Sequence, residues 1–124
     1  MTASSSSRSA LGKRLACLLS GWVFTHMSFA IPARRLRETD TLLAFHHPKP
    51  SYPVHILLVP KQAVPDLMEL DPNSPFLPDL FATVGSLVAE LQLPSYRLIV
   101  NGGAYQDFPH LHFHLVSGSL KADD

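Results

Sequence analysis

The chain has 124 residues, which is enough for one compact domain and too few for two. Hydrophobic residues make up 46% and charged residues 16%, a globular mix that excludes a fully disordered chain. Lys+Arg and Asp+Glu both number 10, so the formal net charge of 0 excludes a protein that binds nucleic acid through charge alone. The single cysteine, Cys17, excludes an intrachain disulfide and a zinc site built from several thiolates.

Residues 1–20 are Ser-rich and basic, and we expect them to form a flexible or helical N-terminal extension. Three interpretations are open here: a secretory signal whose apolar core is 15–29, an organelle transit peptide, and a surface helix that covers the start of the domain. Polar residues such as Ser20 and His26 interrupt the apolar run, so no membrane span is expected. We expect a cytoplasmic protein, with organelle targeting through this Ser/Arg-rich segment as the alternative.

The rest of the chain predicts strands and one main helix. Short apolar runs bounded by Pro or Gly predict strands at 41–46, 54–59, 96–100 and 110–116. Apolar residues at spacings of three and four predict an amphipathic helix over 76–92, with Ser74 as N-cap and Pro75 in the first turn. The elements do not alternate as βαβ units. We therefore predict an α+β fold, with an antiparallel sheet packed on one main helix.

The last predicted strand carries alternating histidines. Side chains of a strand alternate between its faces, so His110, His112 and His114 are expected on one face and the apolar residues between them in the core. Three imidazoles in register are hard to explain by packing. Neighbouring histidines of the triple lie about 6.6 Å apart along a strand, so two of them could bind one metal ion. All three could do so only if the strand were kinked. Metal binding is therefore the alternative to catalysis.

The histidine triple has the chemistry for attack on phosphorus. Neutral imidazole is a good nucleophile near pH 7, and its adduct with phosphorus stays labile to water. The central His112 is placed to attack, while its neighbours can orient phosphate oxygens or pass a proton to the leaving group. Such transfers depend on positioning and charge compensation. The triple predicts phosphoryl or nucleotidyl transfer that requires no metal and no other cofactor.

This pattern resembles the signature of the histidine triad (HIT) family of hydrolases and transferases, His-x-His-x-His with apolar residues between. The segment Pro53–Lys61 resembles the family's Pro-x-His-x-Leu-Val-Ile-Pro-Lys stretch, and residues 22–33 resemble its opening segment. The resemblance is closest to the Hint branch. It implies a HIT-like domain, which we place at 21–119, followed by a C-terminal tail at 120–124.

The resemblance also implies roles for single residues. His112 would form a nucleotidyl-histidine intermediate, with assistance from His110 and His114, and His55 takes the place of the family's fourth histidine. The implied reaction is hydrolysis of a nucleoside phosphoramidate or a related purine nucleotide conjugate at the α-phosphate, in a homodimer whose two sheets join. A dinucleoside polyphosphate hydrolase with the same residues and a non-catalytic nucleotide- or metal-binding protein are the alternatives.

The expected substrate side contains two departures from the Hint pattern. Asn101 and Gln106 would hold the phosphate and ribose side, and His46 belongs to the same expected set. His47 stands where the Hint branch has an Asp that reaches the ribose hydroxyls. Asp107 stands where it has a Ser that touches the phosphate, and a carboxylate there repels a phosphate by about 1 kcal/mol at 4 Å in water. Residues 22–25 lack the cysteines of zinc-binding members, so no zinc site is expected.

Overall fold

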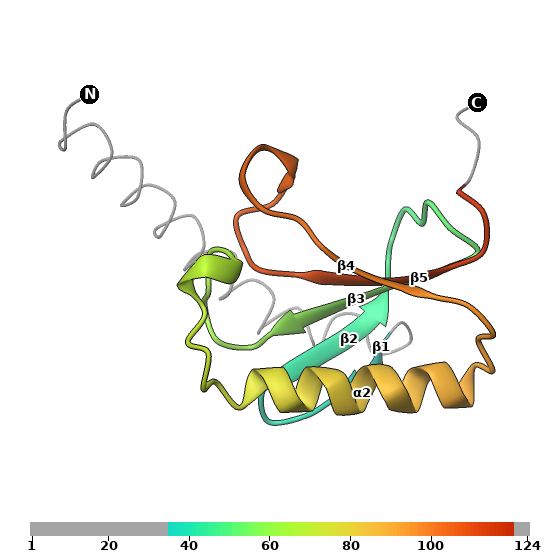
Figure 1. The fold of residues 1–124 in the computed structure, drawn as a ribbon, viewed down its shortest axis with the longest axis horizontal. Coiled ribbons are helices and arrows are strands. Elements are labelled where there is room, and N and C mark those ends of the chain that lie inside the picture. The colour runs from blue at the N-terminus through green and yellow to red at the C-terminus, as the bar shows by residue number, and fades with distance from the viewer. Residues whose placement is uncertain (1–34, 121–124) are drawn as a thin grey trace, which may run out of the picture.

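The structure, a computed structural model, describes residues 35–120 (Figure 1). The predicted N-terminal extension and the end of the predicted tail lie outside the described residues. The described elements are, in chain order, β1 (Arg35–Glu38), β2 (Leu42–His46), β3 (Val54–Pro60), the 3-10 helix η2 (Leu67–Glu69), α2 (Phe76–Glu90), β4 (Arg97–Val100), the 3-10 helix η3 (Gly103–Tyr105) and β5 (Phe113–Ser117).

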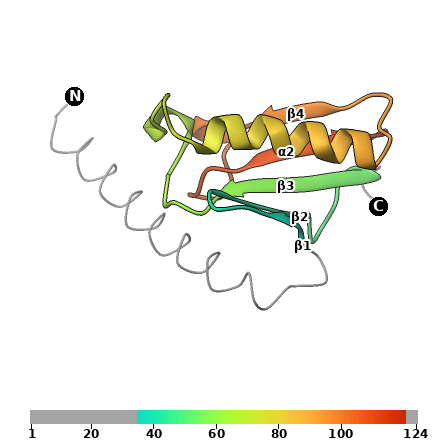
Figure 2. The same ribbon diagram turned by 90° about the horizontal axis from the view of Figure 1, so that it is seen from below.

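The five described strands form one antiparallel sheet in the order β1-β2-β3-β5-β4. Helix α2 lies across one face of this sheet, and the loop between β4 and β5 rises on the other side (Figures 1 and 2). The predicted α+β fold, an antiparallel sheet with one main packed helix, is confirmed. No helix among residues 35–120 is long and apolar enough to cross a membrane.

The main core lies between α2 and the sheet. The apolar stripe of the helix, including Leu80 and Leu87, packs against strand residues such as Ile56 and Leu115, all of them at most 1% exposed. Burial of this kind stabilises a fold by about 25 cal/mol for each Å² of apolar surface removed from water. The helix begins where Ser74 Oγ accepts a hydrogen bond from the main-chain N–H of Phe76 at 3.2 Å. The N-cap position itself is Pro75 and the helix runs from Phe76 to Glu90, so the predicted cap at Ser74 is wrong by one residue, and Ser74 bonds the first turn from the position before the cap.

Two strand predictions differ from the structure. β1 is absent from the predicted strands, because its four residues contain a single apolar side chain and no alternation that a sequence reading detects. The last strand begins at Phe113 and not at His110. The main-chain N–H of Leu111 donates to Val64 O at 2.8 Å, so the backbone before Phe113 bonds to a loop and not to a strand.

The face of the sheet opposite α2 positions the histidines. Leu43, Phe45 and Val59 form a second, smaller apolar cluster on this face, with Leu57 packed against it. In the β3–β5 register Leu57 pairs with His114, and His55 pairs with Val116. Residues directly opposite each other in antiparallel strands point to the same face. His55 and His114 therefore project from neighbouring strands on the side away from the helix.

Candidate active site

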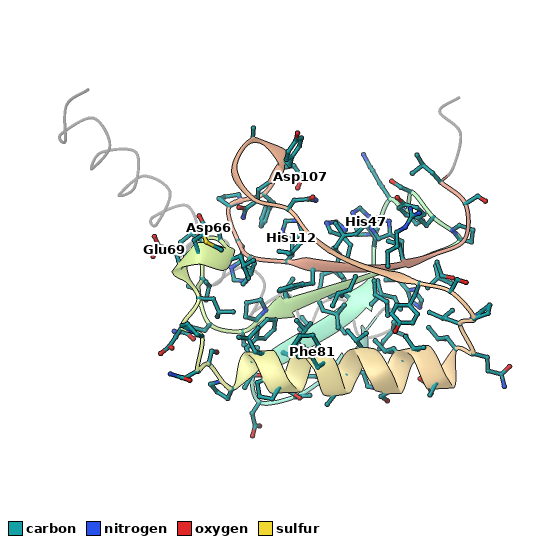
Figure 3. All side chains as sticks on the ribbon, viewed as in Figure 1. His47, Asp66, Glu69, Phe81, Asp107 and His112 are labelled. Carbon is teal, nitrogen blue, oxygen red and sulfur yellow. The ribbon has the colours of Figure 1, made fainter. Side chains whose placement is uncertain are left out.

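A cluster of imidazoles lies on the sheet face opposite α2. Figure 3 places His47 and His112 on this side of the sheet, with Asp107 above them in the β4–β5 loop and Phe81 on the helix side. The His112 and His114 rings meet edge to face, with centroids 5.1 Å apart. The His114 and His55 centroids are also 5.1 Å apart. Three of the four predicted catalytic histidines are thus in direct ring contact.

A chain of hydrogen bonds fixes the protons of His55 and His114, which we call the imidazole pair. The main-chain N–H of Ser51 donates to His55 Nδ1 (3.0 Å), so the neutral His55 ring carries its proton on Nε2. That Nε2–H donates to His114 Nδ1 at 2.9 Å. His114 then carries its proton on Nε2, a buried atom without a hydrogen-bond partner in the part of the chain that the structure describes. The chain of bonds therefore ends in one uncommitted N–H donor.

Burial keeps the imidazole pair neutral. Desolvation lowers the pKa of His55 and of His114 from 6.5 to about 4. Neighbouring imidazoles, His47 for both rings, contribute to the same shift after desolvation, because a positive charge on one ring disfavours a second charge beside it. At pH 7 both rings are uncharged, and this is the state that the hydrogen-bond chain requires.

His112 presents an unprotonated nitrogen beside this donor. Its Nδ1 lies 2.7 Å from the carbonyl oxygen of His110, which can only accept, so Nδ1 carries the proton and donates it. The lone pair of Nε2 is left for attack. The Asp107 carboxylate is 88% exposed and comes within 3.5 Å of that Nε2. The ring is therefore oriented with Nε2 as its nucleophilic atom, and a negative charge lies next to that atom.

His110 is a positioning residue in this structure. Its side chain is fully buried, and its Nε2 donates to the carbonyl oxygen of Pro60 at 3.0 Å. Burial also lowers the pKa of His110, so the ring is neutral. The bond ties the segment before β5 to the end of β3. It thereby holds the His110 carbonyl that orients the His112 ring, which is how His110 assists without lying in the ring cluster.

His47 extends the cluster by one ring. Its centroid lies 4.4 Å from that of His55 and 6.3 Å from that of His114. The main-chain N–H of Lys49 donates to His47 Nδ1 at 2.9 Å, which leaves only Nε2–H for a ligand. Burial lowers the pKa of His47, with the nearby Asp107 opposing the shift. A carboxylate at this position would offer two acceptor oxygens, whereas this ring offers one donor.

The other expected substrate residues are placed less uniformly. Both amide protons of Gln106 Nε2 are used, in bonds to Pro65 O (2.7 Å) and Phe108 O (2.9 Å), so this side chain fixes the β4–β5 loop. Asn101 follows β4 and is half-buried. His46 pairs with Ile56, whose side chain lies in the core against α2, so the register points His46 away from the cluster. The structure does not bring His46 together with the other candidates.

The groups that the sequence reading missed are main-chain atoms. Ser51 N–H and the carbonyl oxygens of His110 and Pro60 set the three ring orientations. Every residue carries such groups, so no residue type signals them. Tyr52, which meets the His55 ring edge-on at 5.6 Å between centroids, was also missed. Its position next to the His55 strand was the one available signal.

Metal ligands do not converge among residues 35–120, where no group of three or more His, Cys, Asp or Glu side chains could hold an ion. The hydrogen bonds of the ring nitrogens explain why these histidines do not converge on a metal ion. Nδ1 of His55, of His112 and of His47 each bonds to a main-chain group. The cluster offers one nucleophilic nitrogen on His112 and, in the adjacent ring, the N–H donor of His114 with the neutral His55 ring behind it. This combination suits nucleophilic attack on a substrate whose leaving group accepts a hydrogen bond.

The sequence matches a known family over most of its length. A family model described as "HIT domain" matches residues 28–120. An uncharacterized 13.2 kDa HIT-like protein of Azospirillum brasilense is 37% identical over 94 residues, which cover 71% of this chain and 77% of that protein. An uncharacterized HIT-like protein of Synechococcus elongatus is 39% identical over 96 residues, covering 74% of this chain and 84% of that protein.

Solved structures agree with the sequence matches. A histidine triad protein from Clostridium difficile has a TM-score of 0.70 at 26% identity, covering 82% of this chain and 94% of that one. A HIT family hydrolase from Legionella pneumophila has a TM-score of 0.66 at 28% identity, covering 74% of this chain and 87% of that one. A histidine triad nucleotide-binding protein from Candida albicans has a TM-score of 0.64 at 26% identity, covering 82% of this chain and 85% of that one. With its family match, its fold and its clustered histidines, the chain belongs to the HIT domain family.

Proposed function

We propose that this protein is a nucleotide hydrolase or nucleotidyl-transferase that cleaves nucleoside phosphoramidates or related nucleotides at the α-phosphate. The observation that carries the proposal is the pairing of two ring nitrogens. His112 Nε2 has an uncommitted lone pair, and the neighbouring His114 Nε2 carries a proton that no described residue accepts. A nucleophile and a hydrogen-bond donor for the leaving group, in adjacent rings, are two groups that such a reaction needs.

The proposed reaction has two steps. His112 Nε2 attacks the α-phosphorus, a nitrogen–phosphorus bond forms on the ring, and the bond to the leaving group breaks. His114 Nε2–H donates a hydrogen bond to the leaving nitrogen, which takes its proton from water as the bond to phosphorus breaks, and the 2.9 Å bond from His55 Nε2–H holds the His114 ring in this tautomer. Water then cleaves the nucleotidyl-histidine and releases a nucleoside monophosphate. His110 keeps the His112 ring oriented through both steps.

The relatives support this reaction class at family level. The solved structure from Legionella pneumophila is described as a hydrolase, and the one from Candida albicans as nucleotide-binding. We extend both descriptions to this chain and propose a purine nucleotide or nucleotide conjugate as substrate. The match between Pro53–Lys61 and the family stretch is the basis for placing the chain in the Hint branch.

The decisive experiment is to trap and weigh the covalent adduct. Purified protein is mixed with adenosine 5′-phosphoramidate, quenched within milliseconds, digested and analysed by mass spectrometry. An adenylyl group on the peptide that contains His112 supports the proposal. Steady-state turnover of diadenosine polyphosphates above that of phosphoramidates would favour the dinucleoside polyphosphate alternative. A lack of turnover with every substrate, together with one tightly bound metal per chain, would favour a non-catalytic binding protein.

We also propose a homodimer that joins two sheets edge to edge. β4 is an edge strand of the described sheet, and its Leu98, Ile99 and Val100 are only partly buried. An unpaired apolar edge is a template for pairing with a second chain. Light scattering should then give twice the mass of one chain, and a monomer at micromolar concentration would contradict this proposal.

For its location we propose the cytoplasm. The family match begins at residue 28, so cleavage of a secretory signal after Ala30 would remove the start of the matched domain. Organelle targeting through residues 1–20 stays the alternative. Imaging of the full chain with a C-terminal fluorescent tag distinguishes the two locations.

A further inference from the structure

A cavity of about 480 Å³ opens where β5 ends, and no role in the proposed reaction has been given to it. Its walls come from the start of β4, the end of β5 and the loop before β3. Small-molecule sites in proteins typically measure about 300–1,000 Å³. The cavity is therefore large enough for a ligand of several heavy atoms and not only for a water molecule.

The cavity lies next to the imidazole pair on the same face of the sheet. Val116, in its wall, pairs with His55 on one side and with Arg97 on the other, and opposed residues share a face. Tyr52, also in the wall, contacts the His55 ring edge-on. From His112, just before β5, the chain passes His114 and then reaches the cavity at the end of the strand. A leaving group that departs from phosphorus at His112 can reach this cavity by passing over His114.

The lining of the cavity is suited to an anion. It contains one cation, Arg97, and five hydroxyl groups, and it contains no carboxylate. The Arg97 side chain is exposed and makes no ion pair or hydrogen bond with residues 35–120, so its five N–H donors are available. Guanidinium groups bind carboxylates and phosphates through charge-assisted hydrogen bonds.

The backbone around the cavity is held in place. Ser117 Oγ donates to the carbonyl oxygen of Ser95 at 2.7 Å and so joins the end of β5 to the start of β4. Gly118 has a φ of +91°, and a Cβ atom there would lie 2.6 Å from Pro53 Cγ. Only glycine fits this turn, and the turn packs directly on the loop before β3.

Strand geometry sets the length of a ligand that would join the two sites. Same-face residues lie about 6.6 Å apart along a strand. Arg97 is opposite Val116, which is four residues from His112, so the two positions are about 13 Å apart along the strand direction. An arginine side chain spans about half of that distance. For a guanidinium that extends along the sheet toward His112, an anion bound at the near edge of the cavity lies roughly 5–8 Å from the α-phosphorus. This exceeds the reach of an α-amino acid carboxylate and matches a longer ω-amino acid or a further phosphate.

We propose that this cavity is the leaving-group subsite and that Arg97 makes it selective for leaving groups with a distal carboxylate or phosphate. The proposal rests on the proposed function. In the step concerned, His112 Nε2 bonds to phosphorus, the phosphorus–nitrogen bond of the substrate breaks, and the departing amine takes up a proton. The anionic end of that amine stays on Arg97 throughout, so no oxidant or further reactant is involved.

The test is a length series of adenosine phosphoramidates made from H₂N–(CH₂)n–COO⁻, with n of 1, 3 and 5. Each acid is paired with its neutral methyl ester, and diadenosine polyphosphates form the phosphate arm. For the wild type, kcat/KM should be about five- to tenfold higher for the acid than for the ester at n of 3 or 5, and nearly equal at n of 1. Arg97→Met should remove this preference without changing turnover of the esters, and Arg97→Lys should retain part of it.

Two controls keep the result specific. Lys61→Met removes a cation at the far end of β3 and should leave the acid-to-ester ratio unchanged. Light scattering confirms that Arg97→Met has the oligomeric state of the wild type. An acid-to-ester ratio near one at all lengths, with no Arg97-dependent rate for polyphosphates, would overturn the subsite while leaving the hydrolase intact. Absence of turnover for acids and esters alike would instead overturn the proposed function, and the subsite with it.

Discussion

His55 Nε2 donates its proton to His114 Nδ1 across 2.9 Å, and this bond joins β3 to β5 on the face opposite α2. Its direction is set by a main-chain group, since Ser51 N–H occupies the other nitrogen of His55. Because both rings are neutral at pH 7, the bond selects one tautomer of His114. The N–H donor that we assign to the leaving group therefore depends on a residue that does not touch phosphorus.

Two substitutions of His55 separate the parts of this bond. A Gln side chain can place its amide nitrogen near the former Nε2 and still donate to His114, whereas an Asn side chain reaches only the former Nδ1. His55→Gln should retain activity to within about tenfold, and His55→Asn should lose about a hundredfold in kcat. Steady-state kinetics on an adenosine phosphoramidate measure both. Equal losses in the two variants would contradict the proton-donating role of His55.

His112→Ala tests the nucleophile. It should lower kcat/KM by about a thousandfold or more, since the Nδ1 atoms of His47, His55 and His114 already accept hydrogen bonds and their Nε2 atoms carry the protons. The fold should persist, because the main core lies on the opposite face. His46→Ala is the matched control, since the register turns His46 away from the cluster. Thermal unfolding and turnover are measured on both variants, and activity of His112→Ala within a few-fold of wild type would refute the assignment.

Side-chain periodicity explains which features could be predicted from the sequence. The alternation after His110 and the spacing of three and four along α2 are local patterns, so the sheet, the helix and the core face follow from them. The resemblance added His55, which the sequence separates from His114 by 59 positions. β1 could not be predicted, because its pairing with β2 uses main-chain groups and little apolar surface. The start of β5 was misplaced for a similar reason, a main-chain bond from Leu111 to Val64.

Asp107→Ser should tighten nucleotide binding. The Asp107 carboxylate lies 3.5 Å from His112 Nε2, where a bound phosphate would face it. Removal of one negative charge about 4 Å from a phosphate is worth roughly 1 kcal/mol in water, so Kd should fall about fivefold. Calorimetry with AMP measures this change, and Asp71→Ser supplies an exposed acid outside the cluster as control. The gain should shrink at 0.5 M salt. An unchanged Kd would place the carboxylate away from the phosphate.

His47→Asp should restore discrimination between ribose and deoxyribose. In the wild type the His47 Nδ1 is occupied by Lys49 N–H, so the ring has one donor for a sugar hydroxyl. A carboxylate offers two acceptor oxygens and can bind both ribose hydroxyls. We expect AMP and 2′-deoxy-AMP to bind the wild type within about threefold of each other, and the variant to prefer AMP by about tenfold. A wild type that already prefers AMP strongly would show that another residue reads the ribose.

Acid should destabilise the fold through the imidazole pair. In the unfolded chain these histidines have a pKa near 6.5, and in the folded protein their pKa is about 4. Between these two values the unfolded state binds more protons, so stability is fully present above pH 6.5 and is lost as the pH falls toward 4. Each group can contribute a slope of at most about 1.4 kcal/mol per pH unit.

Urea unfolding of the wild type and of His55→Gln, measured from pH 4 to 8, isolates the contribution of His55, because the carboxylates are common to both proteins. The two stability curves should differ in slope only between pH 4 and 6.5, and parallel curves across that interval would mean that His55 is not held neutral by burial.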